Sequence, residues 1–214
     1  MSILLKKYYF RYPQYLWAKE IFKLIKEHNL DKKLYFFDAP CGDGVISFWL
    51  SSWIKNAKFK LLDISEKSIK MAKQKNGRLD IQIGDLFEYE NTSKQKYTWL
   101  FINSFFCLKN GEKLIDRYKD DAKNIICIFP DIKHKNYKCH YEKYGFENPT
   151  PLNDVDTISA FQNFGYSLKK KKKITPIPYH CYDFRGQNIF FNTLDKFLGR
   201  KNGAYYICLF SKED

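Results

Sequence analysis

With 214 residues, of which 44% are hydrophobic and 18% aromatic, the chain has enough apolar side chains to bury the core of one domain, and these proportions exclude a disordered protein. No apolar run approaches the roughly 18 residues of a membrane-spanning helix. The segment Ile3-Leu4-Leu5 is too short for the core of a signal peptide. We therefore predict a cytoplasmic protein that does not span a membrane.

The net charge of +13 is compatible with a nucleic-acid partner. Only five of the 37 basic residues are arginines, however, and the lysines are spread along most of the chain. Arginine forms planar, bidentate contacts with phosphates and bases, and lysine does not. We therefore favour a solvated, lysine-rich surface. The six cysteines lack C-x-x-C spacing, which favours buried free thiols over disulfides or a metal site.

Helical and strand-like patterns alternate along the chain. The first helix is expected from Pro13, which suits a first helical turn, to about His28, because apolar residues recur at helical spacing between them. Further helices are expected at residues 45–55, 66–72, 112–119 and 155–164. Apolar runs typical of strands lie at residues 34–37, 59–62, 79–83, 97–102, 125–129, 167–174 and 204–211. This alternation predicts βαβ units, and therefore an α/β protein with a mostly parallel sheet.

No linker or repeat divides the sequence, so we predict a single domain over residues 1–214. Residues 1–30 would form an N-terminal aromatic segment and a helix. Residues 131–153 and 175–203 lack periodicity and are expected to be insertions beside the substrate. The five lysines of Lys169–Lys173 are compatible with a phosphate- or membrane-binding patch, but we favour an edge strand whose lysines prevent pairing with other chains.

The most informative stretch is Asp38–Gly44 (Asp-Ala-Pro-Cys-Gly-Asp-Gly), between the first expected strand and its helix. Gly42 and Gly44 allow a sharp turn and a close approach of the backbone to a ligand. Open α/β sheets bind ligands beside such loops, at the carboxyl ends of parallel strands. The loop lacks the P-loop lysine, and Asp43 would repel a pyrophosphate, whereas the loop tolerates a cationic ligand.

Three aspartates, Asp38, Asp63 and Asp85, follow successive expected strands. If these strands are neighbours, their carboxyl ends line one crevice. Asp63 lies roughly 20 residues beyond the glycines, the spacing at which dinucleotide sites place a carboxylate on the ribose hydroxyls. Asp85 would then accept a hydrogen bond from the exocyclic amine of adenine. The pattern predicts a nucleoside pocket.

These segments resemble the class I S-adenosylmethionine (SAM)-dependent methyltransferases. The resemblance rests on Asp38–Gly44, on Leu62-Asp63-Ile64-Ser65 with a helix that ends in Met71-Ala72-Lys73, and on Gly84-Asp85-Leu86. It implies a doubly wound, seven-stranded sheet with helices on both faces and an antiparallel last strand, and S-adenosyl-L-methionine as the cofactor. Pro40 departs from the family, in which glycine is frequent at that position.

The resemblance also implies roles for single residues. Gly42 and Gly44 would lie beside the methionine moiety, and Asp63 would bind the ribose hydroxyls. Asp85 and Leu86 would hold the adenine. The cofactor-binding set that it implies, with no metal, is Asp38, Ala39, Pro40, Cys41, Gly42, Gly44, Asp63, Ile64, Ser65, Gly84, Asp85, Leu86, Asn103 and Ser104.

The implied reaction is methyl transfer by in-line displacement, in which the protein aligns the acceptor and excludes water. A hydroxyl acceptor needs a general base, and the candidates are His134, His140 and His180, because a neutral imidazole titrates near the working pH. Asn103-Ser104-Phe105-Phe106 lacks the two prolines typical of enzymes that methylate planar nitrogens. We therefore predict a small-molecule or sugar-type acceptor, methylated at oxygen. The alternatives are an RNA methyltransferase and a partner protein that binds the cofactor without catalysis.

Overall fold

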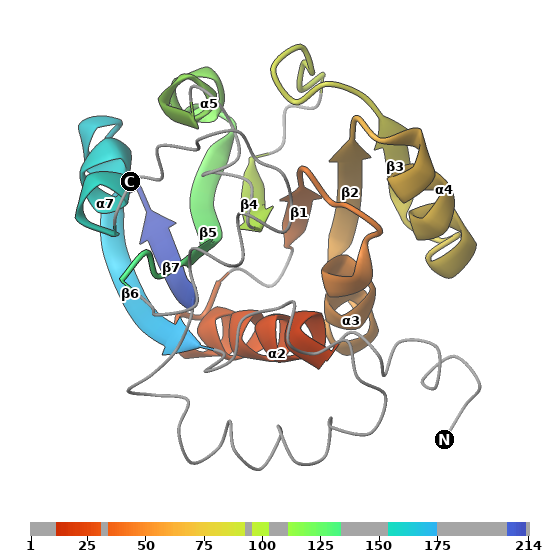
Figure 1. Cartoon of the computed structure of the whole chain (residues 1–214), viewed down its shortest axis with the longest axis horizontal. Coiled ribbons are helices and arrows are strands. Elements are labelled where there is room, and N and C mark those ends of the chain that lie inside the picture. The colour runs from red at the N-terminus through yellow and green to blue at the C-terminus, as the bar shows by residue number, and fades with distance from the viewer. Residues whose placement is uncertain are drawn as a thin grey trace.

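The computed structural model describes residues 12–30, 34–92, 96–102, 111–133, 154–174 and 205–212. Its strands are β1 (Tyr35–Asp38), β2 (Lys58–Asp63), β3 (Asp80–Ile83), β4 (Tyr97–Ile102), β5 (Ala122–Pro130), β6 (Ser167–Ile174) and β7 (Tyr205–Ser211). They form one sheet in the order β3-β2-β1-β4-β5-β7-β6 (Figure 1). The first five strands pair in parallel, whereas β7 runs antiparallel to both β5 and β6. The predicted α/β class and the antiparallel last strand are confirmed.

The described helices are α2 (Tyr12–Glu27), α3 (Val45–Trp53), α4 (Glu66–Lys75), α5 (Gly111–Tyr118) and α7 (Asp154–Asn163). In Figure 1, α2 and α3 lie on one side of the sheet, and α5 and α7 lie on the other. The central strands are apolar on both faces: Ile126 belongs to the core beneath α2 and α3, and its neighbour Cys127 belongs to the core beneath α5 and α7. Burial on both faces explains why these strands are continuous apolar runs in the sequence.

Two helix ends have well-defined capping contacts. Ser65 caps α4, because its side-chain oxygen accepts a hydrogen bond from the backbone N–H of Ser68 at 3.3 Å. After α7, Gly165 adopts a left-handed conformation with φ of 81°. The N–H of Tyr166 then donates to the carbonyl of Phe161 at 3.2 Å, and that of Gly165 donates to Gln162 at 2.9 Å, which is a Schellman motif.

The largest differences from the expected elements are three residues long: β5 begins at Ala122, three residues before the apolar run, and α4 ends at Lys75, three residues later than expected. Asn124 accepts a hydrogen bond from the hydroxyl of Ser211 at 2.6 Å, so a polar pair extends the pairing of β5 with β7. α3 ends at Trp53, two residues earlier than expected. β6 is an edge strand, as predicted. Within the described ranges, no helix is long and apolar enough to cross a bilayer.

Candidate functional site

The glycine loop, residues 38–44, connects β1 to α3 at the carboxyl edge of the sheet. It is tied to the neighbouring strand, because the N–H of Cys41 donates to the carbonyl of Leu62 at 2.9 Å. Gly42 and Gly44 both have left-handed backbone conformations, with φ of 55° and 69°. A side chain is strained at either position.

The two glycines face different surroundings. A Cβ atom on Gly44 would lie 2.9 Å from a methyl carbon of Leu61 and 3.1 Å from the side-chain nitrogen of Asn76, so Gly44 permits packing inside the protein. A Cβ on Gly42 would meet no atom of the described residues within 4 Å. The backbone at Gly42 therefore borders open space, where a ligand can approach it. Gly84 resembles Gly44, since a Cβ there would lie 2.9 Å from Leu62.

Asp63, the last residue of β2, connects the glycine loop to the start of α4. Its Oδ2 accepts a hydrogen bond from the N–H of Gly42 at 2.7 Å, and its Oδ1 accepts one from the N–H of Ser65 at 2.8 Å. Its carboxylate is largely buried. Each carboxylate oxygen has a second acceptor position, so the group can still receive two ligand hydroxyls.

Asp38, the last residue of β1, is fully buried. Its Oδ2 accepts a hydrogen bond from the hydroxyl of Ser47 on α3 at 2.6 Å, and its Oδ1 accepts none from the described residues. Burial raises the pKa of Asp38 to about 7; the charges of Asp63 and Asp43 act in the same direction, and the Ser47 hydrogen bond opposes them. A buried carboxylate oxygen without a donor can accept from a cationic ligand.

Asp43 is paired with Lys75 at the end of α4. On the next residue of that helix end, the side chain of Asn76 donates to the carbonyl of Gly44 at 3.3 Å. Neither partner was predicted from the sequence, from which the loop was expected to carry the full negative charge of Asp43. The ion pair offsets that charge, so the carboxylates without a cation here are those of Asp38 in the loop and Asp63 on β2, among the described residues.

The third aspartate lies beside the second, because the N–H of Gly84 donates to the carbonyl of Asp63 at 3.1 Å. Asp85 Oδ1 accepts from the N–H of Phe87 at 2.8 Å, so the residue shapes the turn that follows β3. Its Oδ2 has no hydrogen bond from the described residues. Ile64 and Ile83, at the ends of β2 and β3, are 69% and 54% exposed.

The other predicted cofactor residues differ in surroundings. Ala39 and Leu86 are buried, whereas Pro40 and Cys41 are half-buried. The hydroxyl of Ser65 is engaged in capping α4. Burial and the carboxylates of Asp38 and Asp63 raise the pKa of the Cys41 thiol well above its usual range, so this thiol is not a nucleophile.

Several predicted residues lie outside the described part of the chain. These are the pocket residues Asn103 and Ser104 and the candidate bases His134, His140 and His180. Most of the two predicted insertions, 131–153 and 175–203, lies there as well. Within the described residues, no group of three or more histidine, cysteine, aspartate or glutamate side chains is arranged to hold a metal ion.

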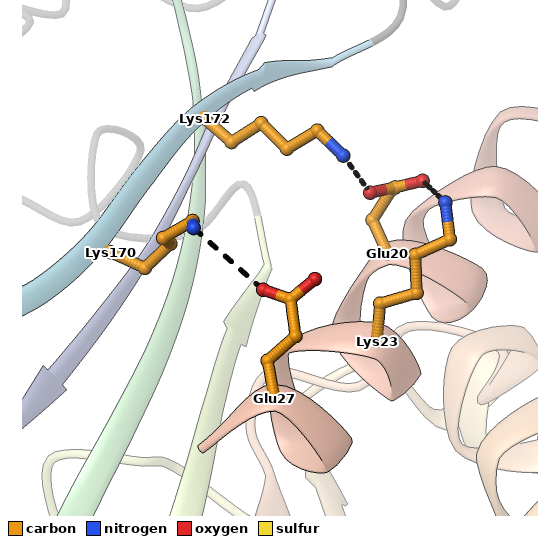
Figure 2. A network of polar contacts seen from close by, with 5 residues as sticks. All are labelled: Glu20, Lys23, Glu27, Lys170 and Lys172. Atoms are coloured by element: carbon orange, nitrogen blue, oxygen red, sulfur yellow. Dashed lines mark hydrogen bonds and ion pairs between the residues drawn. The ribbon is translucent and has the colours of Figure 1, made fainter.

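The lysine strand, Lys169–Lys173 of β6, has partners on both faces of the sheet. Figure 2 shows Glu20 of α2 between Lys23 and Lys172, and Glu27 opposite Lys170 at 3.8 Å. On the other face, Lys173 donates to Asp131 at 2.7 Å. The ammonium of Lys171 lies 4.6 Å from the ring centroid of Tyr206. Most ammonium groups of this strand therefore contact an acid or an aromatic ring of the protein, which favours a structural role.

Solved methyltransferase structures share this arrangement over most of the chain. The sarcosine dimethylglycine methyltransferase from Galdieria sulphuraria matches with a TM-score of 0.67, 13% identity, and coverage of 92% of this chain and 84% of that one. The magnesium protoporphyrin IX methyltransferase from Synechocystis PCC 6803 with bound SAH (S-adenosylhomocysteine) matches with a TM-score of 0.63, 16% identity, and coverage of 94% and 84%. The fold is that of the class I SAM-dependent methyltransferases.

A third structure with this methyltransferase fold, a SAM-dependent enzyme from Clostridium acetobutylicum, matches with a TM-score of 0.65, 12% identity, and coverage of 95% of this chain and 92% of that one. By sequence, the chain is similar to methyltransferase 235L of Invertebrate iridescent virus 6, with 26% identity over 166 residues, or 68% of this chain. The match spans 60% of the length of that relative. No family model matches the sequence.

Proposed function

We propose that the protein is a SAM-dependent methyltransferase that moves a methyl group to a small-molecule or sugar-type acceptor, at oxygen. The observation that carries this proposal is the carboxylate of Asp63, held by the N–H groups of Gly42 and Ser65. Two neutral backbone donors fix its orientation at the carboxyl edge of the sheet, and its remaining acceptor positions suit the two hydroxyls of a ribose.

The surrounding residues fit the rest of the cofactor. Open space beside Gly42 admits the methionine moiety, and the donor-free oxygen of Asp38 suits its ammonium group. The exposed side chain of Ile64 offers an apolar surface to the adenine ring. Asp85 Oδ2 accepts from the exocyclic amine, and Leu86 supports the base from the buried side. For Gly42, Asp85 and Leu86 these are the roles that the sequence resemblance implies, whereas the roles of Asp38 and Ile64 are part of the present proposal.

The bound cofactor supplies a methyl group on a positively charged sulfur, which is an activated leaving group. The remaining tasks of the protein are to orient the acceptor in line and to exclude water. A hydroxyl acceptor also loses a proton during the transfer, so a base is needed. We propose one of His134, His140 and His180 in that role.

The pairing of surface charges favours a small acceptor over RNA. Proteins with this fold bear names that include a porphyrin and an amino acid derivative, so the fold leaves the acceptor open. An RNA substrate needs a surface of uncompensated cations along the backbone path. In the lysine strand, Lys170, Lys172 and Lys173 are compensated by acids. This favours a small acceptor.

Calorimetry with SAH tests the proposal. Wild-type protein is expected to bind, and Asp63→Asn is expected to bind about 30- to 100-fold more weakly, because a charged acceptor is lost and the new amide opposes a backbone N–H. The matched control is Asp116→Asn on α5, an exposed aspartate that forms an ion pair, among the described residues, with Lys119 just after the helix. Wild-type protein that binds neither SAM nor SAH, or equal affinity for Asp63→Asn, would refute the proposal.

The two alternatives have their own readouts. The charge of +13 and the aromatic content favour RNA, and an RNA acceptor would show binding that falls steeply with added salt. A partner protein without catalysis would bind SAH and transfer no methyl group from labelled SAM to a broad panel of alcohols, sugars and RNAs. Methylation of one of the alcohols or sugars, with binding insensitive to salt, supports the small-molecule enzyme.

A further inference from the structure

We propose that Tyr118 and Arg117, at the end of α5, are positioning residues for the adenine end of the cofactor. They hold the adenine turn, residues 85–89, which follows β3 and carries Asp85 and Leu86. The inference rests on the proposed function, because it assumes that this turn contacts the base. Neither residue belongs to the motifs from which the cofactor site was predicted.

Tyr118 holds the turn from inside the protein. The residue is 2% exposed, and its hydroxyl donates to the carbonyl oxygens of Leu86 and Tyr89, the latter at 2.8 Å. Its ring packs on Trp99 with the centroids 4.4 Å apart. Burial raises the pKa of Tyr118, so its hydroxyl keeps its proton and remains a donor.

Arg117 holds the same turn from the surface. Its guanidinium donates to the carbonyl of Glu88 at 3.3 Å and to that of Tyr89 at 3.1 Å. The side chain is exposed, so these bonds compete with water and contribute less than those of Tyr118. Together the two residues engage three backbone carbonyls of the turn, those of Leu86, Glu88 and Tyr89.

The carbonyls of the turn need donors from outside it, because the N–H groups of the turn bond to Asp85. The N–H of Phe87 bonds to Asp85 Oδ1, and those of Glu88 and Tyr89 bond to the Asp85 carbonyl. The carbonyls of Leu86, Glu88 and Tyr89, which Tyr118 and Arg117 engage, are not part of this network. The direction of the Asp85 carboxylate is therefore fixed on one side by its own turn and on the other by α5.

A second tyrosine provides a matched control. Tyr166 is also 2% exposed, and its hydroxyl also donates to two backbone carbonyls, at 2.8 Å to Ala122 and 3.3 Å to Lys119. Those carbonyls belong to a residue just before β5 and to the first residue of β5, and not to the end of β3. Loss of either hydroxyl removes the same kind of bond from the same kind of environment, and only Tyr118 contacts the adenine turn.

The experiment compares Tyr118→Phe with Tyr166→Phe. Affinity is measured by calorimetry for SAH and for its inosine analogue, in which a carbonyl replaces the exocyclic amine. Tyr118→Phe is expected to weaken SAH binding about 5- to 20-fold and to reduce the preference for SAH over the analogue, because a misplaced Asp85 no longer reads the amine. Tyr166→Phe is expected to leave both quantities within about twofold of wild type.

Arg117→Ala and hydrogen exchange give independent readouts. Because Arg117 is exposed, this substitution leaves the core intact, and we expect a smaller loss of SAH affinity in the same direction. In the absence of cofactor, Tyr118→Phe should accelerate exchange at the Phe87 amide, and Tyr166→Phe should not. Equal effects of the two tyrosine substitutions, or an unchanged preference for SAH in Tyr118→Phe, would overturn the inference. Wild-type protein that does not bind SAH would instead refute the proposed function.

Discussion

The acidic edge, formed by Asp38, Asp43 and Asp63 at the ends of β1 and β2, contrasts with the lysine strand of β6. In the lysine strand, acids from α2 and from the end of β5 pair with the lysines. At the acidic edge, Asp43 is the one aspartate that pairs with a cation from the described residues; Asp38 and Asp63 accept hydrogen bonds from a hydroxyl and from backbone N–H groups, all of them neutral.

This difference separates structural charges from functional ones. A charge that is compensated inside the protein has little left to offer a ligand. A carboxylate that is oriented by neutral donors still attracts a cationic ligand. This attraction is stronger in a buried site, where the dielectric constant is low. We therefore expect changes at the acidic edge to alter ligand binding, and changes at the lysine strand to alter stability alone.

The largest expected effect concerns pH. Because the pKa of Asp38 is raised to about 7 from its usual 3.8, the folded protein holds a proton that the unfolded chain releases. Stability is therefore expected to fall as pH rises from about 4 through 7, and binding of a cationic cofactor, which requires the ionised form, to strengthen about tenfold per pH unit below 7. Calorimetry with SAM across this range checks the slope.

Two variants give the controls for that prediction. Asp38→Asn should flatten both the stability and the binding profile between pH 4 and 7. Ser47→Ala removes the hydrogen bond that lowers the pKa, so the midpoint of the binding profile should move to higher pH. A wild-type profile that is already flat would show that Asp38 does not exchange its proton for the cofactor.

The sequence predicted the sheet and the acidic edge for a common reason. Strands buried on both faces are long apolar runs in the sequence. The residues at the carboxyl ends of parallel strands lie at one edge of the sheet, independently of the conformation of the loops. Asp38, Asp63 and Asp85 could thus be grouped without coordinates. The missed start of β5 at Ala122 lies where a polar pair, Asn124 and Ser211, extends the strand beyond its apolar run.

The side chains that contact the predicted residues could not be predicted from patterns in the sequence. Lys75 and Asp43 are 32 positions apart, as are Tyr118 and Leu86, and Lys172 and Glu20 are 152 apart. No periodicity links such pairs, because they are defined by how helices pack on the sheet. Ser47 gave no signal either, since a serine in a first helical turn is usually exposed or a cap.

The second-largest expected effect is a loss of stability when an ion pair of the lysine strand is removed. Burial opposes ionisation of Glu20, but the hydrogen bonds and charges of Lys172 and Lys23 outweigh it and lower the pKa of Glu20. Glu20→Gln should therefore reduce the free energy of unfolding by about 1 kcal/mol near pH 7, after screening, and by progressively less as pH falls below about 4.5.

Chemical denaturation of Glu20→Gln, with Glu112→Gln as control, measures that loss. Glu112 is an exposed glutamate in the first turn of α5, and the described residues give it no ion pair. SAH affinity should be the same for both variants and wild type. A loss of cofactor affinity in Glu20→Gln would contradict the separation of the two regions, because it would connect α2 to the acidic edge.

The smallest expected effect concerns Asp43. This residue lies at the acidic edge, as the ligand-binding aspartates do, but it is paired with a cation, as the acids at the lysine strand are. Lys75→Ala removes that cation and also loosens the glycine loop. Loosening weakens SAM and neutral-sulfur SAH alike, whereas the uncovered charge of Asp43 attracts the sulfonium of SAM alone. The ratio of SAM to SAH affinity should therefore rise about twofold, even if both affinities fall. An unchanged ratio would mean that Lys75 acts only by packing, and Asp43 would then belong with the structural charges.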